Sequence, residues 1–315
     1  MIPAKTKRAA WLGGWLLMMS LISLLIAACG ETATPIATTT AVTTAAATTS
    51  AAPTTAVATS GVTTGATSAT GTANGEVVVF AAASLTEPFN QIKTELEKAN
   101  PGLKITYSFG GSNTLRTQLE QGAKADVFAS ANQTEMDKAL ASNLVPDKGT
   151  TFVRNRLVVI LPKGNPGKIQ KLQDLANPGL KFVTAQKDVP VGGYTLTALD
   201  KMSKDPAFGN DFSTKVQTNI VSRETDVKQV VAKIQIGEGD VGVVYSSDVT
   251  AKVSLDITTI EIPDQFNTVA SYPIAILKGA SNPSAAKVFI DYVLGANGQA
   301  ILKKNNFVPV FNLAG

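Results

Sequence analysis

The stretch FAAASLTEPF, residues 80–89, follows three valines at 77–79 and shows how this chain passes from a strand into a helix. The valines are typical of a buried strand, and the spacing from Ser84 to Glu87 fits the capping box that opens many helices. The alanines at 81–83 are too small to fill a core, so the turn leaves room for another group to approach the backbone. The stretch therefore predicts a strand, a tight turn and a helix, with open space where they meet.

The same order of strand and helix continues along residues 76–315. Strands are predicted at 77–81, 104–109, 126–129, 156–161 and 241–245, and helices at 88–99, 114–121, 133–141, 194–202 and from 227 to Gly237. This alternation is typical of α/β folds with mainly parallel sheets and right-handed crossovers.

A body of about 240 residues could form one barrel or two smaller lobes. Two long apolar strands, at 157–161 and 273–277, lie far apart in the sequence and could carry the chain from one lobe to the other. We therefore predict two lobes, with lobe 1 at about 76–157 and 270–315 and lobe 2 at about 158–269.

The N-terminal part is not predicted to belong to this body. Three basic residues, Lys5, Lys7 and Arg8, precede an apolar run at 11–28 that ends at Cys29, the one cysteine of the chain. This order is typical of a secretory signal, and the ending Ile-Ala-Ala-Cys resembles the bacterial lipoprotein signal, in which the cysteine is lipidated. The alternative is a single uncleaved membrane anchor. Both place the body outside the cytoplasm.

Residues 29–75 are predicted to be the lipidated cysteine and a tether. From residue 31 on they are mostly threonine and alanine, with Glu31 as the one charged residue and no aromatic residue. Such a segment cannot bury enough apolar surface to offset the entropy lost on ordering, so we expect it to be disordered.

Composition excludes several classes of function. Removal of residues 1–28 takes away three of the 28 basic residues and none of the 24 acidic ones, which leaves the mature chain near +1. No basic run or aromatic cluster indicates binding of nucleic acid. The chain has no histidine, so catalytic triads with histidine and histidine-ligated metals are excluded.

Four predicted helix starts are rich in small residues. They lie at Ser84, at Ser112 in FGGSNTL (109–115), at Val191 in VPVGGY (189–194), and at Val227, which follows the predicted cap Asp226. A helix start offers unpaired N–H groups and a partial positive charge, and in α/β sheets the helix starts gather at the carboxyl ends of the strands. Each of these turns is also common in purely structural loops.

One aromatic hydroxyl joins this set, because Tyr245 ends the strand 241–245. A lone tyrosine usually serves packing, but at the carboxyl edge of a sheet it can also donate a hydrogen bond to a ligand. Helix starts and hydroxyls with little fixed positive charge suit a desolvated oxyanion that is held by neutral donors.

With these residues in view, the body resembles the periplasmic molybdate-binding proteins of ABC transporters, the ModA family. The resemblance covers about residues 76–311 and rests on several motifs: FAAASLTEPF, FGGSNTLRTQL, GAKADVFASANQTEMD, DVPVGGYT, TDVKQVVAKIQIGEGDVGVVYSSDV and YPIAIL. It implies a two-lobed type II solute-binding fold, with helices flanking each sheet and two crossover strands between the lobes.

The resemblance also implies a ligand set for molybdate or tungstate. The hydroxyls would come from Ser84, Ser112 and Tyr245, and the backbone donors from Val191 and Val227. In position 191 the family often has alanine, which matters little because the backbone N–H is the group used. A tungstate-binding branch has an aspartate before the proline of the third loop, where this chain has Val189, so no carboxylate ligand and no direct protein ligand to the metal are expected.

Further expectations follow from the same resemblance. The protein would be a lipid-anchored monomer on the extracytoplasmic face of the cell membrane, without a cofactor and without catalytic activity. It would deliver its ion to a membrane permease whose partner ATPase supplies the energy.

Three alternatives stay open. Another oxyanion such as sulfate or phosphate could be the ligand. The body could also be an extracytoplasmic hydrolase that uses carboxylates such as Asp126, Asp188, Asp226 or Asp240. Finally, it could be a surface interaction domain on a threonine-rich stalk.

Overall fold

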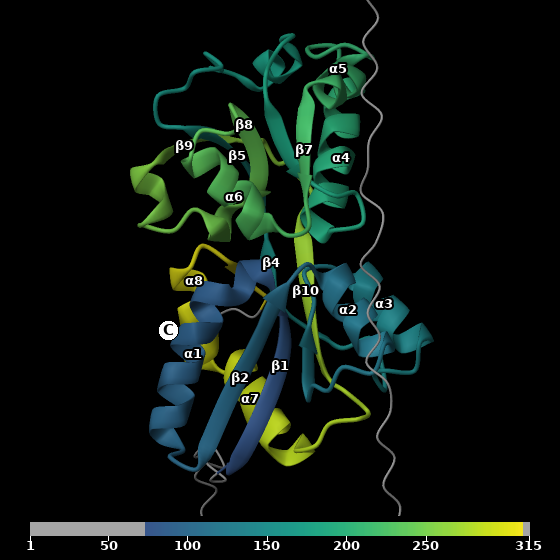
Figure 1. Ribbon diagram of the computed structural model, residues 1–315, viewed down its shortest axis with the longest axis vertical. Coiled ribbons are helices and arrows are strands. Elements are labelled where there is room, and N and C mark those ends of the chain that lie inside the picture. Colours follow the sequence, from purple (N-terminus) through teal and green to yellow (C-terminus); the bar gives the residue numbers. More distant parts are fainter. Residues whose placement is uncertain (1–72, 311–315) are drawn as a thin grey trace, which may run out of the picture. The chain divides into compact units, whose positions relative to one another are not determined.

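The computed structural model describes residues 73–310, all within one compact unit of the chain, Ala66–Gly315. The predicted signal peptide, Cys29 and nearly all of the predicted tether lie outside the described residues. Within 73–310, no helix combines the length and the apolar character that a membrane span requires. Figure 1 shows two sheets, each flanked by helices.

The first sheet has six strands in the order β11-β4-β10-β3-β1-β2. Its strands are β1 (Gly75–Ala82), β2 (Leu103–Gly110), β3 (Val127–Ala129), β4 (Thr150–Asn155), β10 (Ala270–Ile276) and β11 (Val308–Pro309). The helices that pack on it are α1 (Thr86–Ala99), α2 (Ser112–Glu120), α3 (Gln133–Ala141), α7 (Pro283–Leu294) and α8 (Ala296–Lys304). We call this sheet and its helices lobe 1.

The second sheet has five strands in the order β7-β6-β8-β5-β9. Its strands are β5 (Leu157–Pro162), β6 (Phe182–Ala185), β7 (Ile220–Glu224), β8 (Val241–Tyr245) and β9 (Ile257–Glu261). It packs against α4 (Pro190–Ser203) and α6 (Val227–Gln235), and α5 (Phe212–Thr218) packs in turn on α4 and on a short helical turn at Leu172–Ala176. We call this sheet and its helices lobe 2.

Both sheets are mixed, whereas the sequence predicted mainly parallel sheets. In lobe 1, β1 pairs in parallel with β2 and β3, but β10 runs antiparallel to β3 and β4. In lobe 2, β6 is parallel to β7 and β8, but β5 is antiparallel to β8 and β9. The reversed strands include β5 and β10, the strands that follow the two crossings, because a strand that arrives from the other lobe enters the sheet from the opposite end; the short β11 is also antiparallel to β4.

The chain crosses between the lobes twice, as the sequence predicted. At the first crossing Arg156 alone separates β4 from β5, and at the second, residues 262–269 lead from β9 into β10 (Figure 1). The two-lobed α/β architecture is therefore confirmed, although each of the two apolar strands expected to cross belongs to a single sheet.

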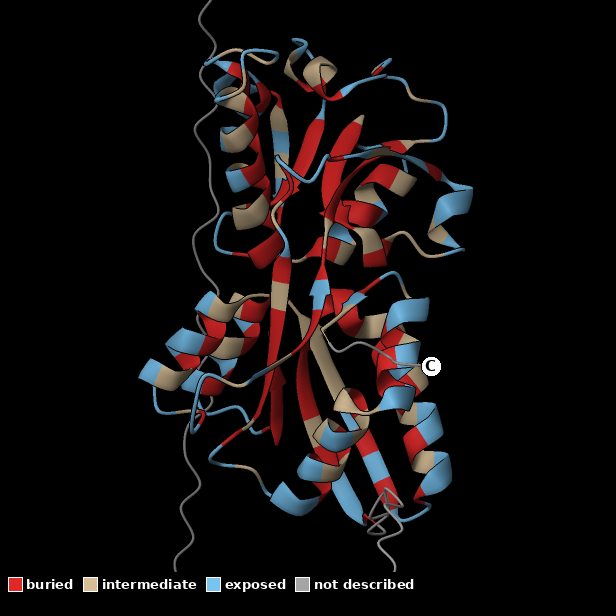
Figure 2. Cartoon of the chain, turned by 180° about the vertical axis from the view of Figure 1, so that it is seen from behind, coloured by how far each residue is buried: buried red, intermediate tan, exposed pale blue. Residues whose placement is uncertain are grey.

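The cores are built from apolar residues that recur at helical and strand spacing. In α1, Phe89, Ile92 and Leu96 are buried at helical spacing, and the ring of Phe89 meets that of Phe289 edge-on at 5.5 Å. Full burial of one such side chain contributes about 1.5–3 kcal/mol. Figure 2 shows that the strands are mostly buried and that the helices are exposed on their outer faces.

The start of α1 differs from the predicted capping box. A short 3-10 turn at Ala83–Leu85 precedes the helix, the cap position belongs to Leu85, and no side chain caps it. The two residues of the expected box are used elsewhere, because the Ser84 hydroxyl contacts Tyr272 and the Glu87 carboxylate contacts Lys228.

Candidate functional site

One small cavity brings together residues from both lobes. Ser84 and Ser112 reach it from lobe 1, and Val191, Val227 and Tyr245 from lobe 2. The cavity volume is about 10 Å³, far below that of pockets for organic ligands. All five residues predicted from the sequence as ligands therefore line one cavity, although the sequence places them up to about 160 positions apart.

Helix starts surround this cavity. Ser112 is the first residue of α2, Val227 is the first of α6, and Val191 is the second of α4, which begins at Pro190 rather than at the predicted residue 194. The N–H groups of a first helical turn have no partner within the helix, and the helix dipole adds a partial positive charge there. Three helices thus direct unpaired donors and positive potential toward one point.

The cap of α6 leaves its first N–H free for a ligand. The carboxylate of Asp226 accepts hydrogen bonds from the N–H groups of Lys228 (2.8 Å) and Gln229 (3.1 Å), as the sequence predicted for a cap. The N–H of Val227 precedes both. Asp226 therefore fixes the helix start without claiming the donor closest to the cavity.

The three hydroxyls of the site differ in their partners. Ser84 Oγ lies 2.9 Å from Tyr272 Oη, and Ser112 Oγ accepts a hydrogen bond from the Ala131 N–H at 3.0 Å. The Tyr245 hydroxyl is buried and has no hydrogen-bond partner among the described residues. A buried hydroxyl without a partner is costly, so Tyr245 is a group for which a bound ligand would supply the acceptor.

The Tyr245 hydroxyl remains protonated across the physiological range. Burial raises the pKa of Tyr245 well above its ordinary value, and the neighbouring Tyr272 raises it further. The residues that line the cavity include no lysine, arginine or histidine. Apart from the carboxylate of Asp226, which caps α6, its chemistry is therefore that of neutral hydrogen-bond donors.

A glycine allows the lobes to approach closely beside the cavity. A Cβ atom added to Gly111, in front of α2, would lie 2.5 Å from the carbonyl oxygen of Thr225 in lobe 2. Contacts of that length do not occur between a real Cβ and a backbone oxygen, so any other residue at Gly111 would push the lobes apart. This explains the second glycine in the FGGS motif.

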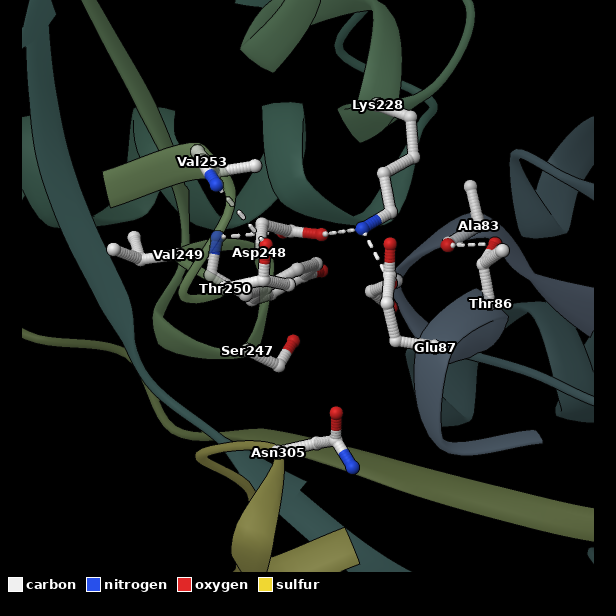
Figure 3. Close-up of polar contacts among 12 residues, drawn as sticks. Ala83, Thr86, Glu87, Lys228, Ser247, Asp248, Val249, Thr250, Val253 and Asn305 are labelled. Carbon is white, nitrogen blue, oxygen red and sulfur yellow. Dashed lines mark hydrogen bonds and ion pairs between the residues drawn. The ribbon is translucent and has the colours of Figure 1, made fainter. Parts of the chain in front are cut away.

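An ion-pair cluster lies near the cavity and joins the lobes (Figure 3). Lys228 Nζ of lobe 2 lies 2.7 Å from Glu87 Oε2 of lobe 1 and 3.3 Å from Asp248 Oδ1 of lobe 2. Burial alone would lower the pKa of Lys228, but Asp248 and Glu87 raise it above its ordinary value. Asp248 is fully buried, and burial raises its pKa although Lys228 opposes the shift.

The sequence alone does not reveal this cluster. Glu87 and Lys228 are 141 positions apart, and each has the pattern of an ordinary surface charge on a helix. The one available signal was position in the sequence. Lys228 directly follows the site residue Val227, and Asp248 comes shortly after Tyr245.

Most of the carboxylates considered for hydrolysis have other partners. Asp126 accepts hydrogen bonds from three backbone N–H groups, Asp240 accepts one from Lys181, and Asp188 is exposed. Of the four, only Asp226 lines the cavity, and there it caps α6. Three of the four thus hold backbone in place.

Comparison with known proteins assigns the family. Residues 77–308 match the family of bacterial extracellular solute-binding proteins. The molybdate-binding protein ModA of Mycobacterium tuberculosis H37Rv is 38% identical over 231 residues, which cover 73% of this chain and 84% of that protein. The chain belongs to the ModA family of solute-binding proteins. The Escherichia coli K12 member of the ModA family is 32% identical over 241 residues, 74% of this chain and 89% of that protein.

A solved structure supports the same assignment to the ModA family. The substrate-binding domain of a putative molybdenum ABC transporter from Clostridium difficile is 29% identical, with a TM-score of 0.55. The match covers 75% of this chain and 99% of that domain. The type II two-lobed fold expected from the sequence is thus confirmed.

Proposed function

We propose that this chain captures molybdate or tungstate in the cavity between its lobes and delivers the ion to an ABC permease. The hydroxyls of Ser84, Ser112 and Tyr245 and the N–H groups of Val191 and Val227 bind the four oxygens. The ion is held whole, without a bond from a protein atom to the metal. The chain itself catalyses no reaction, because the partner ATPase supplies the energy of transport.

The convergence of these five neutral donors on one small cavity is the observation that carries the proposal. Named relatives at 32–38% identity are molybdate-binding proteins, and their name agrees with a compact oxyanion as the ligand. The size of the cavity argues against an organic substrate. The unpartnered hydroxyl of Tyr245 argues for a ligand that accepts hydrogen bonds.

Neutral donors provide sufficient affinity. A hydrogen bond to a charged acceptor contributes about 1.5–3 kcal/mol net. Five to seven such bonds, after the losses from immobilising the ion, reach roughly 8–12 kcal/mol, which corresponds to micromolar to nanomolar dissociation constants. Without a fixed cation in the site, a dianion is also easier to release to the permease.

A lipid anchor would keep the protein beside the permease to which it delivers the ion. We propose that Cys29 carries the lipid, that residues 29–75 are the tether, and that the body acts as a monomer on the extracytoplasmic face. Detergent-phase partitioning of the wild type but not of Cys29→Ala is expected. Equal partitioning of the two proteins would favour an uncleaved anchor instead.

Calorimetric titration and thermal unfolding of the full-length chain in mild detergent test which oxyanion binds. At a molybdate or tungstate concentration about 100-fold above Kd, binding adds about 2.7 kcal/mol of stability. For a body of this size the melting temperature then rises by about 5–10 °C. Sulfate should give a smaller rise, and the double variant Ser84→Ala/Ser112→Ala should lose most of it.

Ser213→Ala is the matched control. Ser213 is a buried serine of α5 whose hydroxyl donates a hydrogen bond to Asp200, and it does not line the cavity. This variant should keep the full rise in melting temperature. Equal rises with all oxyanions would refute the specificity for molybdate and tungstate. No rise with any of them would refute the carrier function and favour an interaction domain.

A further inference from the structure

A chain of buried polar groups leads from the cavity to the first crossing between the lobes. Ser84 Oγ lies 2.9 Å from Tyr272 Oη, and the side-chain amide nitrogen of Asn155 lies 3.3 Å from the same Tyr272 oxygen. Ser84 is 1% exposed, and Tyr272 and Asn155 are fully buried. Tyr272 and Asn155 do not line the cavity, so their polar groups have a role other than direct contact with the ligand.

The orientation of the Asn155 amide follows from its neighbours. The backbone N–H of Arg156 lies 3.0 Å from one end of this amide, and a backbone N–H can only donate. That end is therefore the oxygen, which also accepts from the Ser246 hydroxyl at 3.0 Å. The other end is the NH2 group, which donates to Tyr272 and, at 2.8 Å, to Ser247.

This orientation determines the direction of the next hydrogen bond. The Tyr272 oxygen accepts a proton from Asn155, so its own single proton needs an acceptor. Within the described part of the chain, Ser84 Oγ is the partner that remains for it. Burial raises the pKa of Tyr272 above its ordinary value, so this proton stays in place at any pH the protein meets.

We propose that Tyr272, oriented by Asn155, is a positioning residue that turns the hydroxyl proton of Ser84 toward the bound ion. Ser84 accepts from Tyr272, and its own proton is then free to point into the cavity. This inference rests on the proposed function, since it describes how the site prepares one of its donors. It explains why the fully buried Tyr272 hydroxyl contacts Ser84 without lining the cavity.

Ser112 is prepared in the same way by the backbone. Its oxygen accepts from the Ala131 N–H at 3.0 Å, and because that N–H can only donate, the proton of Ser112 is also free for the ion. The two serines thus present protons from the same lobe. Only the arrangement at Ser84 depends on side chains, which makes it accessible to substitution.

This arrangement determines which protonation state of an oxyanion binds. Each serine oxygen already accepts one hydrogen bond, so it could accept a proton from the ligand only through its second lone pair and by turning its own proton away from the ion. A fully deprotonated ion such as molybdate satisfies every donor, whereas hydrogen phosphate carries a proton that finds an acceptor only where a serine gives up its own donation. Tyr272 therefore contributes to selectivity as well as to affinity.

Tyr272→Phe tests the proposal, because it removes the hydroxyl and keeps the ring that packs against Phe152 and Phe307. In calorimetric titrations of the full-length chain, we expect the Kd for molybdate to rise about 10-fold. The preference for molybdate over hydrogen phosphate at pH 8 should fall, since the Ser84 hydroxyl becomes free to rotate and accept. In a Ser84→Ala background the same substitution should change neither quantity.

Tyr107→Phe is the matched control, because the Tyr107 hydroxyl is partly buried and donates to the carbonyl oxygen of Phe89 at 2.7 Å, away from the cavity. It should lower stability without changing Kd or selectivity. Thermal unfolding verifies that each variant folds. If Tyr272→Phe does not fold, Asn155→Ala replaces it, with the same expected loss of affinity and the same dependence on Ser84.

The outcomes separate this inference from the proposed function. If the wild type does not bind molybdate, the proposed function fails. If it binds and Tyr272→Phe leaves affinity and selectivity unchanged, the positioning role alone is refuted. An equal loss of affinity with and without the Ser84 hydroxyl would also refute it, because Tyr272 would then act through packing.

Discussion

The ion pair between Glu87 and Lys228 should strengthen ligand binding, because it joins lobe 1 to lobe 2 beside the cavity (Figure 3). An ion enclosed by both lobes can enter only when they separate, and separation breaks this contact. Glu87→Gln removes the charge but keeps an oxygen that can accept from Lys228. The substitution therefore tests the contribution of the charge to the closed arrangement.

The size of the effect follows from the exposure of the two side chains. Two unit charges at about 4 Å attract by about 4 kcal/mol at an effective dielectric constant near 20, but by about 1 kcal/mol in water. The side chains are 27% and 36% exposed, and desolvation and side-chain entropy offset much of the attraction. We therefore expect a net contribution of about 1 kcal/mol, which corresponds to a roughly 5-fold rise in Kd for Glu87→Gln.

Calorimetric titration with molybdate at low and high salt measures this effect. The wild type should lose affinity as salt screens the ion pair, and Glu87→Gln should lose less. Glu97→Gln is the matched control, since Lys93 and Glu97 are 2.7 Å apart and 34% and 28% exposed but both lie in α1. A Kd for Glu87→Gln within twofold of the wild type, with the same salt dependence, would refute the reasoning.

Three further predictions follow from the same site. Tyr245→Phe should leave the ligand-free protein as stable as the wild type or more stable, because it removes an unpartnered buried hydroxyl, yet it should raise the Kd for molybdate about 10-fold in titration. Gly111→Ala should weaken binding by at least 10-fold, since its methyl group would meet the Thr225 carbonyl, whereas Gly110→Ala, whose methyl group meets only the Leu115 side chain at 3.5 Å, should be tolerated. The folded state raises the pKa of Lys228, so its contribution to stability is fully present below its ordinary value of 10.5 and should disappear in thermal unfolding as the pH rises above it.

The fold was predictable because its signals are local. Apolar runs of strand length, helical spacing of buried residues and glycine at helix ends all lie within short windows of sequence. Val227 and Ile234 illustrate this, as both are buried at helical spacing in α6, and Gly237 follows that helix with a positive φ of 76°. The mixed strand directions were not predictable, since direction depends on how distant strands pair.

The candidate site was partly predictable for a related reason. Helix starts after strands meet at one edge of a sheet, so Ser112 and Val227 could be placed near a ligand from local pattern and topology. The supporting groups could not, because Tyr272 contacts Ser84 across 188 positions and looks like an ordinary strand residue. The capping-box pattern at Ser84 and Glu87 was misleading for the same reason, since distant partners take both side chains.

The placement of charge explains why a neutral site is compatible with a nearby lysine. Lys228 follows the donor Val227 directly, but its ammonium group faces the carboxylates of Glu87 and Asp248 and not the cavity. These two carboxylates outweigh the single cation, so the cluster offers a dianion no net attraction. Affinity must then come from directed hydrogen bonds and helix starts, which discriminate by geometry in a way that a point charge does not. The lysine serves closure, and the neutral donors serve recognition.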